Sequence, residues 1–88
     1  MPRYIIERSV PALSRDELMA AGRRSAAVLA LLPDVLWIRS YVSDAEGKFY
    51  CEYDAPSAEA IREHARRAGL PIDRISEIAL EINPSMFV

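Results

Sequence analysis

Three residue types that carry much protein chemistry are scarce in this sequence, which has one cysteine, one histidine and one tryptophan. A single cysteine cannot form an internal disulfide, which favours a reducing compartment such as the cytoplasm. No apolar run approaches the roughly 20 residues of a membrane-spanning helix. Arg3, Glu7 and Arg8 interrupt the apolar core that a signal peptide would need. We therefore expect a soluble cytoplasmic protein with no membrane partner.

The sequence also lacks an excess of positive charge and the local motifs of common enzymes. Its formal net charge is -2, whereas nucleic-acid-binding domains normally carry a basic stripe, so we expect no nucleic-acid partner. A glycine-rich phosphate loop, an HExxH motif, a CxxC motif and a nucleophile elbow are all missing. No catalytic class is therefore indicated by a local motif.

Apolar residues, in contrast, make up 51% of the 88 positions. A chain of this length forms one domain, 1–88, with a modest core that buries roughly 60% of the surface of the unfolded chain. Such an apolar share is at the high end for a small soluble domain. Because a partner subunit usually covers the excess, the composition favours an oligomer.

Hydrophobic periodicity and capping signals divide the chain into four strands and two helices. Ser14 followed by Glu17 is the capping box of the first helix. Ser57 is the N-cap of the second helix, and Gly69 ends it. Pro11 ends the first strand because it lacks an N–H donor. The predicted strands are 3–10, 35–43, 48–54 and 72–82, and the predicted helices are 15–31 and 58–68.

This order of elements is that of the ferredoxin-like βαββαβ sandwich, an α+β fold in which a four-stranded antiparallel sheet carries two helices on one face. The other face of the sheet is uncovered in a monomer. Strict alternation along 35–43 places Trp37, Arg39 and Tyr41 together on one face of their strand. Because aromatic residues on an uncovered face mark an interface, we predict a homodimer.

Trp37 and Arg39 also have a second interpretation, as part of a ligand pocket. An aromatic wall beside a cation suits a small anionic ligand, and Tyr53 and Glu7 on neighbouring strands would complete the lining. The same residue types are enriched at dimer interfaces, and a pocket at a subunit interface would use both properties. Strand carboxylates such as Glu7 also form cross-strand ion pairs. The sequence leaves these interpretations open.

Cys51 and His64 are each the sole residue of their type, and thiolate and imidazole groups bind late first-row metals such as nickel, copper and zinc. Their spacing matches no structural zinc motif. A cysteine among apolar strand residues is also an ordinary core residue, and a histidine in a charged helix is ordinarily solvated. The sequence does not show whether the two side chains meet.

Four segments taken together resemble DUF4242, a small bacterial family of uncharacterised function that includes a nickel-responsive, nickel-binding protein. The segments are WIRSYV at 37–42, YCEYDAP at 50–56, AIREHA at 60–65 and GLP at 69–71. The resemblance spans nearly the whole chain. It implies a ferredoxin-like homodimer that binds nickel or a similar divalent metal, with no organic cofactor. Tyr41, Cys51 and His64 match the family pattern and are the implied metal ligands.

One departure from the family pattern bears on the implied metal. Relatives often carry a histidine where this chain has Arg39, and arginine is not a metal ligand at neutral pH. A cation at this position suits an anionic organic ligand instead. The alternative hypothesis is a small dimeric α+β enzyme of the isomerase, cyclase or cofactor-free oxygenase type. Its anionic substrate would bind in a cleft near Arg39 and His64, with His64 as a proton carrier.

Overall fold

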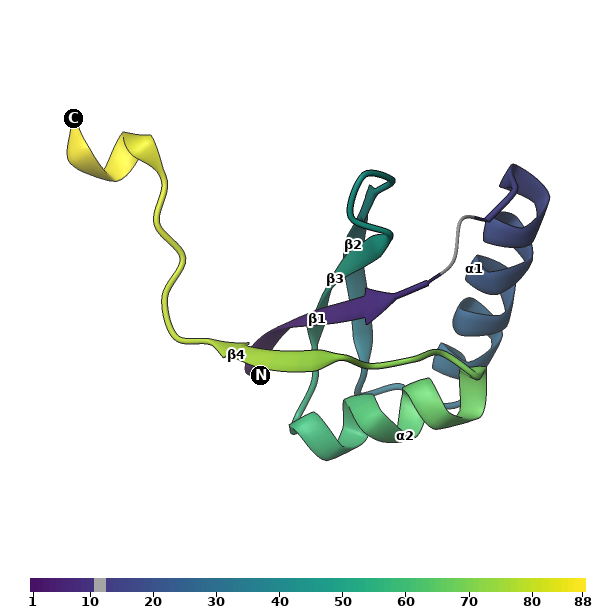
Figure 1. The fold of residues 1–88 in the computed structure, drawn as a ribbon. Helices are drawn as coiled ribbons and strands as arrows, with labels where there is room; N and C mark the ends of the chain where they lie inside the picture. The colour runs from purple at the N-terminus through teal and green to yellow at the C-terminus, as the bar shows by residue number, and fades with distance from the viewer. Residues whose placement is uncertain (11–12) are drawn as a thin grey trace.

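The chain folds into the predicted order of elements, β1-α1-β2-β3-α2-β4, followed by a short 3₁₀ helix (Figure 1). The computed structural model describes residues 1–10 and 13–88, so that Pro11, predicted to end the first strand, lies outside the described residues. The elements are β1 (Arg3–Ser9), α1 (Arg15–Leu29), β2 (Leu36–Ser43), β3 (Lys48–Asp54), α2 (Ala58–Ala68), β4 (Arg74–Ile78) and η1 (Pro84–Phe87).

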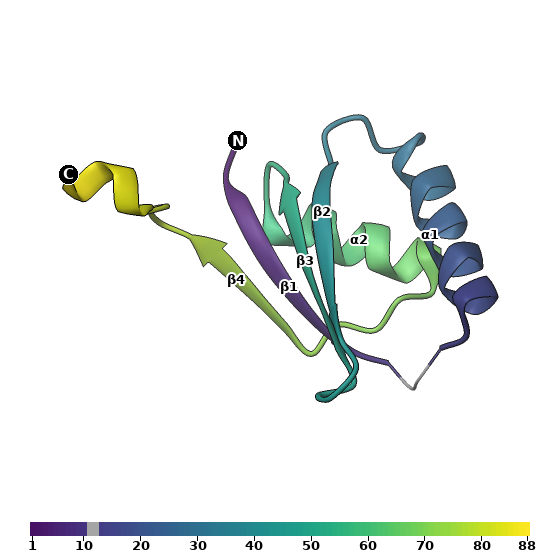
Figure 2. The same ribbon diagram turned by 90° about the horizontal axis from the view of Figure 1, so that it is seen from above.

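The four strands form one antiparallel sheet in the order β2-β3-β1-β4, and both helices cover the same face of it (Figure 2). This is the predicted ferredoxin-like α+β fold. The core lies between the sheet and the helices, and its buried members include Tyr4, Ile6, Cys51, Tyr53 and Ile61. Neither α1 nor α2 combines the length and the apolar content needed to traverse a bilayer.

Local signals explain where the helices begin and end. The Ser14 hydroxyl accepts a hydrogen bond from the Glu17 N–H at 3.1 Å, and the Glu17 carboxylate accepts one from the Ser14 N–H at 3.0 Å. This capping box satisfies two donors that have no partner within α1. Gly69 ends α2 in the left-handed conformation. One face of α2 is buried against the sheet, through Ile61, His64, Ala65 and Ala68.

Two glycines give a matched pair of stability predictions. At Gly69 φ is +68°, which strains any residue with a Cβ, so Gly69→Ala should lower the free energy of unfolding by about 1–2 kcal/mol. At Gly22, inside α1, an added Cβ would meet no atom within 4 Å. Gly22→Ala should therefore raise the free energy of unfolding by up to about 1 kcal/mol. Urea denaturation of both variants checks the opposite signs, and a shared sign would contradict this assignment.

The last strand is shorter than predicted. The expected strand 72–82 is β4, which runs only from Arg74 to Ile78. β4 pairs with β1 alone, and its last residue, Ile78, lies opposite Arg3, the first residue of β1. The chain beyond Ile78 therefore has no strand of the sheet left to pair with. It continues as an extended segment that leaves the sheet on the side away from both helices (Figures 1 and 2).

The predicted alternation along β2 was wrong because β2 contains a β-bulge. Trp37 lies opposite Tyr53 and Arg39 lies opposite Glu52, so two steps along β2 match one step along β3. The extra residue reverses the alternation after Trp37. Trp37 therefore shares the helix-covered face with Tyr53, whereas Arg39 and Tyr41 lie on the open face. Trp37, Arg39 and Tyr41 do not form one surface.

Candidate ligand-binding site

The sheet separates the residues that the sequence proposed for a metal site. Cys51 and His64 are buried on the helix-covered side, and Tyr41 lies on the open face with 54% of its surface exposed. Among residues 1–10 and 13–88, no three or more histidine, cysteine, aspartate or glutamate side chains gather closely enough to hold a metal ion. The geometry of a single chain therefore does not fit a metal held by Tyr41, Cys51 and His64.

The proposed pocket residues are divided in the same way. Trp37 and Tyr53 lie on the helix-covered side, and Arg39 and Glu7 lie on the open face. Glu7 forms a cross-strand ion pair with Lys48 at 3.5 Å. A cleft joining Arg39 to His64 would have to cross the sheet, so the cleft expected for an enzyme does not form around these two residues.

A partly open cavity of about 100 Å³ lies between α1 and the helix-covered face of the sheet. Its wall is mostly apolar, with side chains from α1, β2, β3 and the segment that follows α2, namely Leu18, Trp37, Val42, Phe49 and Leu70. Polar residues also line it: Arg8, Ser25, Ser40, Cys51 and Tyr53. The site therefore contains Trp37 and Tyr53, as predicted for a pocket, but its cation is Arg8 and not Arg39.

Arg8 is a buried cation without a carboxylate partner. Its side chain lies on the core face of β1 beside Tyr4 and Ile6, and only 1% of its surface is exposed. Nη1 donates a hydrogen bond to the Pro71 carbonyl at 2.9 Å, and Nη2 donates one to the Tyr53 hydroxyl at 3.5 Å. Within the described part of the chain, Nε has no hydrogen-bond partner and Arg8 takes part in no ion pair. A buried charge neutralised only by neutral acceptors destabilises the folded chain.

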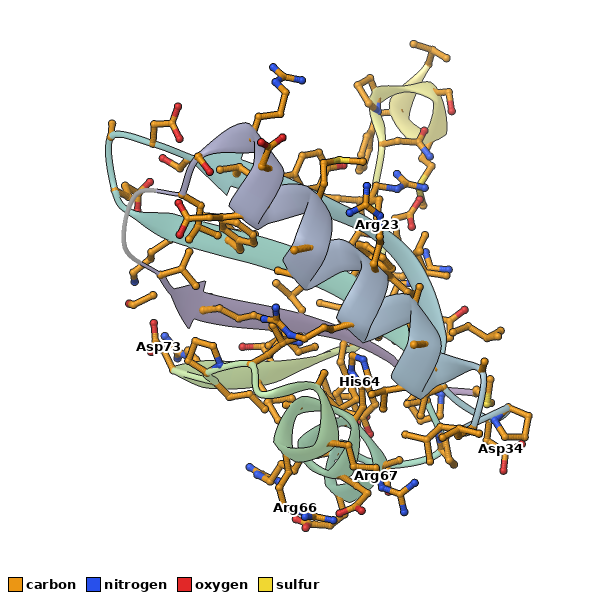
Figure 3. The ribbon with its side chains drawn as sticks, turned by 90° about the vertical axis from the view of Figure 1, so that its right-hand side faces the viewer. Arg23, Asp34, His64, Arg66, Arg67 and Asp73 are labelled. Atoms are coloured by element: carbon orange, nitrogen blue, oxygen red, sulfur yellow. The ribbon has the colours of Figure 1, made fainter. Side chains whose placement is uncertain are left out.

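His64 lies behind the cavity and supports two of its lining residues. It projects from the side of α2 that faces α1 and the sheet, whereas Arg66 lies on the outer side (Figure 3). Its Nε2 is 3.1 Å from the Ser25 hydroxyl, and its ring centroid is 5.4 Å from that of Tyr53. Nδ1 has no partner among the described residues. His64 therefore positions Ser25 and Tyr53 and does not itself line the cavity.

Burial controls the ionisation of this group of side chains. Desolvation lowers the pKa of His64, and the nearby Arg8 cation lowers it further, against the opposing effect of Ser25. Desolvation raises the pKa of the Tyr53 phenol, and Arg8 opposes that shift. At neutral pH the imidazole is therefore neutral and the phenol protonated. Arg8 is the single formal charge of the lining.

The most important lining residue, Arg8, is one that the sequence did not single out. The signal was present, because alternation along the first strand places Arg8 on the same face as Tyr4 and Ile6. An arginine two residues after a buried isoleucine indicates either a strand end or a buried cation. Ser25 carried a similar signal, since it lies within the helical apolar pattern of α1 and is buried.

Fold and cavity together define a small α+β protein with a ferredoxin-like sandwich and an apolar cavity that contains one buried cation. The chain belongs to the family described as nickel responsive protein SCO4226-like, whose model matches residues 4–78. The resemblance drawn from the sequence, to a family with a nickel-responsive member, agrees with this description. No curated protein gives a significant match.

A solved structure supports the same assignment. The chain is similar to SCO4226 from Streptomyces coelicolor A3(2), with a TM-score of 0.79 and 27% sequence identity. The alignment covers 91% of this chain and 99% of the SCO4226 chain. The likeness therefore extends over the whole sandwich.

Proposed function

We propose that this chain is a small ligand-binding protein and that its ligand is a small, mostly apolar molecule with one anionic group. The observation that carries this proposal is Arg8, a buried guanidinium that lines the cavity with unused donor capacity and no carboxylate partner. A bound carboxylate would supply both the missing charge and the missing acceptors. The apolar wall would then cover the rest of the ligand.

The size of the cavity limits the ligand. At about 100 Å³ it is smaller than the roughly 300–1,000 Å³ of typical small-molecule sites, and smaller than the cavity of about 150 Å³ that accommodates benzene in an engineered protein. A short aliphatic carboxylate has a suitable volume. Because such a ligand has few atoms, we expect a dissociation constant on the order of 1 mM.

Thermal and urea denaturation in sodium butyrate tests this proposal, with sodium chloride and butyramide at the same concentration as controls. At about 100 times the dissociation constant, bound butyrate should raise the free energy of unfolding by about 2.7 kcal/mol. Butyramide has nearly the same shape without the charge and should have little effect. An equal response to butyrate and butyramide, or no response to either, would contradict the proposal.

A cavity-blocking variant supplies a second control. Gly22 lines the cavity, and a side chain added there meets no atom within 4 Å of its Cβ. Gly22→Met should therefore fill the cavity without replacing any polar lining residue. We expect Gly22→Met to remain folded and to lose the response to butyrate. A full butyrate response in Gly22→Met would place the binding elsewhere on the protein.

Nickel is a second candidate ligand, and the description of the family favours it. The residues to test are Tyr41, Cys51 and His64, which do not share a site in one chain. We therefore expect any heat in a calorimetric titration with nickel chloride to persist in Cys51→Ala and in His64→Ala. A nickel signal abolished by either substitution would overturn this expectation and assign the metal to these residues.

The homodimer and the cytoplasmic location are also part of the proposal. The open face of the sheet exposes Tyr41 and Leu36 and has no helix over it (Figure 2). A second copy placed on this face would cover both sheets, as the resemblance to DUF4242 implies. The lone cysteine, Cys51, is buried and unpaired, which is consistent with a reducing cytoplasm.

A further inference from the structure

We propose that residues 79–88, called here the C-terminal arm, dock on the open sheet face of a second copy of the chain. This inference rests on the proposed homodimer and adds to it the segment that holds the two copies together. The family match ends at Ile78, immediately before the arm. The arm is therefore a feature that this chain carries beyond the matched region.

The arm is extended and largely uncovered. It leaves β4 and runs away from the rest of the molecule in both views (Figures 1 and 2). Among the described residues, its single ion pair to the sandwich joins Glu81 to Arg3 at 3.5 Å. Leu80 and Phe87 each expose 72% of their surface, and the other exposed apolar residues of the arm are Ile82, Met86 and Val88.

The arm has the composition of an interface and not of a solvated tail. Segments that stay unfolded in water are polar and rich in charge, whereas the arm has one charged residue, Glu81. Its tip has a defined shape, because the Asn83 side chain accepts a hydrogen bond from the Ser85 N–H at 3.1 Å and caps η1. An apolar segment with its own local structure requires a surface that covers it.

A second copy is the occupant that fits the arm best. The open face contains a broad groove of about 370 Å³ beside the origin of the arm, with Ile5, Ile78 and Arg39 in its lining. Arg3 on this face is paired with Asp54 at 2.9 Å, but Arg39 takes part in no ion pair within the described residues. The partner's single charge, on Glu81, complements Arg39.

Two-fold symmetry makes this exchange self-consistent. Each copy presents one uncovered groove and one uncovered arm on the same side of the sheet (Figure 2). In an isologous dimer, the arm of each copy meets the groove of the other, and both surfaces are covered at once. A head-to-tail contact would instead leave one arm and one groove uncovered at the ends of every assembly.

Sedimentation equilibrium of the full chain tests the inference with the variant Leu80→Ser, Ile82→Ser, Phe87→Ser. All three side chains are exposed, so the sandwich should remain folded, which circular dichroism checks. We expect the wild-type protein to be a dimer and the variant to have a dimer dissociation constant at least roughly 100-fold higher. Met19→Ser is the matched control, because Met19 is an apolar residue on α1 with 51% of its surface exposed. Met19→Ser should leave the dissociation constant unchanged.

The outcomes separate the arm from the dimer. A variant that dimerises as tightly as the wild type would overturn the arm inference and leave the homodimer in place. A wild-type protein that stays monomeric throughout the concentration range would overturn both. A charge exchange tests the contact itself: Glu81→Arg and Arg39→Glu should each weaken the dimer, and the double variant should restore it. Failure of the double variant to restore it would remove Arg39 as the partner of Glu81.

Discussion

Replacing Arg8 with methionine will abolish the response to butyrate and leave the protein folded. The substitution removes the charge and the donors but keeps an unbranched chain of similar length. Loss of charge-assisted hydrogen bonds should lower the affinity for butyrate roughly 10–100-fold. The variant should also lose the preference for butyrate over butyramide. Butyrate-dependent shifts in the urea midpoint measure both effects.

The stability of the ligand-free Arg8→Met protein separates a binding role from a structural one. A buried cation without a carboxylate destabilises the folded chain, so an apolar replacement should be neutral or stabilising. Arg39→Met is the matched control on the opposite face of the sheet, and it should keep the full butyrate response. If Arg8→Met lost more than about 2 kcal/mol of stability and still bound butyrate, Arg8 would be a structural residue and the proposed site would be wrong.

The order of elements was predictable because each boundary has a local cause. Ser14 and Glu17 begin α1 through hydrogen bonds three residues apart, and Gly69 ends α2 through its own backbone conformation. Such signals act within a few residues and are therefore visible in the sequence. The ferredoxin-like topology then follows from the order of strands and helices.

The features that the sequence did not reveal depend on pairing across the sheet. The bulge between Trp37 and Arg39 arises from the register of β2 on β3, and it decides which aromatic residues face the helices. The end of β4 at Ile78 is set by where β1 begins, not by the composition of 79–82. The site was mispredicted for the same reason, because strict alternation put Arg39 beside Trp37 and left Arg8 unnoticed.

Lowering the pH from 7 to 5 will destabilise this protein, and His64 will be the cause. Burial lowers the pKa of His64, so the unfolded chain binds a proton more readily than the folded chain in this range. The stability that the neutral imidazole contributes is complete above the unfolded pKa of about 6.5. It is lost as the pH falls from there toward the lower folded pKa. Each unit of pKa lowering corresponds to about 1.4 kcal/mol.

The assignment to His64 is sharp because it is the only histidine of the chain. The carboxylates whose pKa values are lowered stay ionised throughout this window; Arg66 and Arg67, for example, hold the pKa of Glu63 at about 2. Their contributions are lost only at lower pH. Urea denaturation at pH 5, 6 and 7 measures the slope, and His64→Gln, which keeps an amide within reach of Ser25, should remove it. A slope of the same size in His64→Gln would show that His64 is not the group that titrates. A shallower butyrate response at pH 5 in the wild type, but not in His64→Gln, would further link this imidazole to the cavity, because a second cation behind Ser25 and Tyr53 would disturb the residues that it positions.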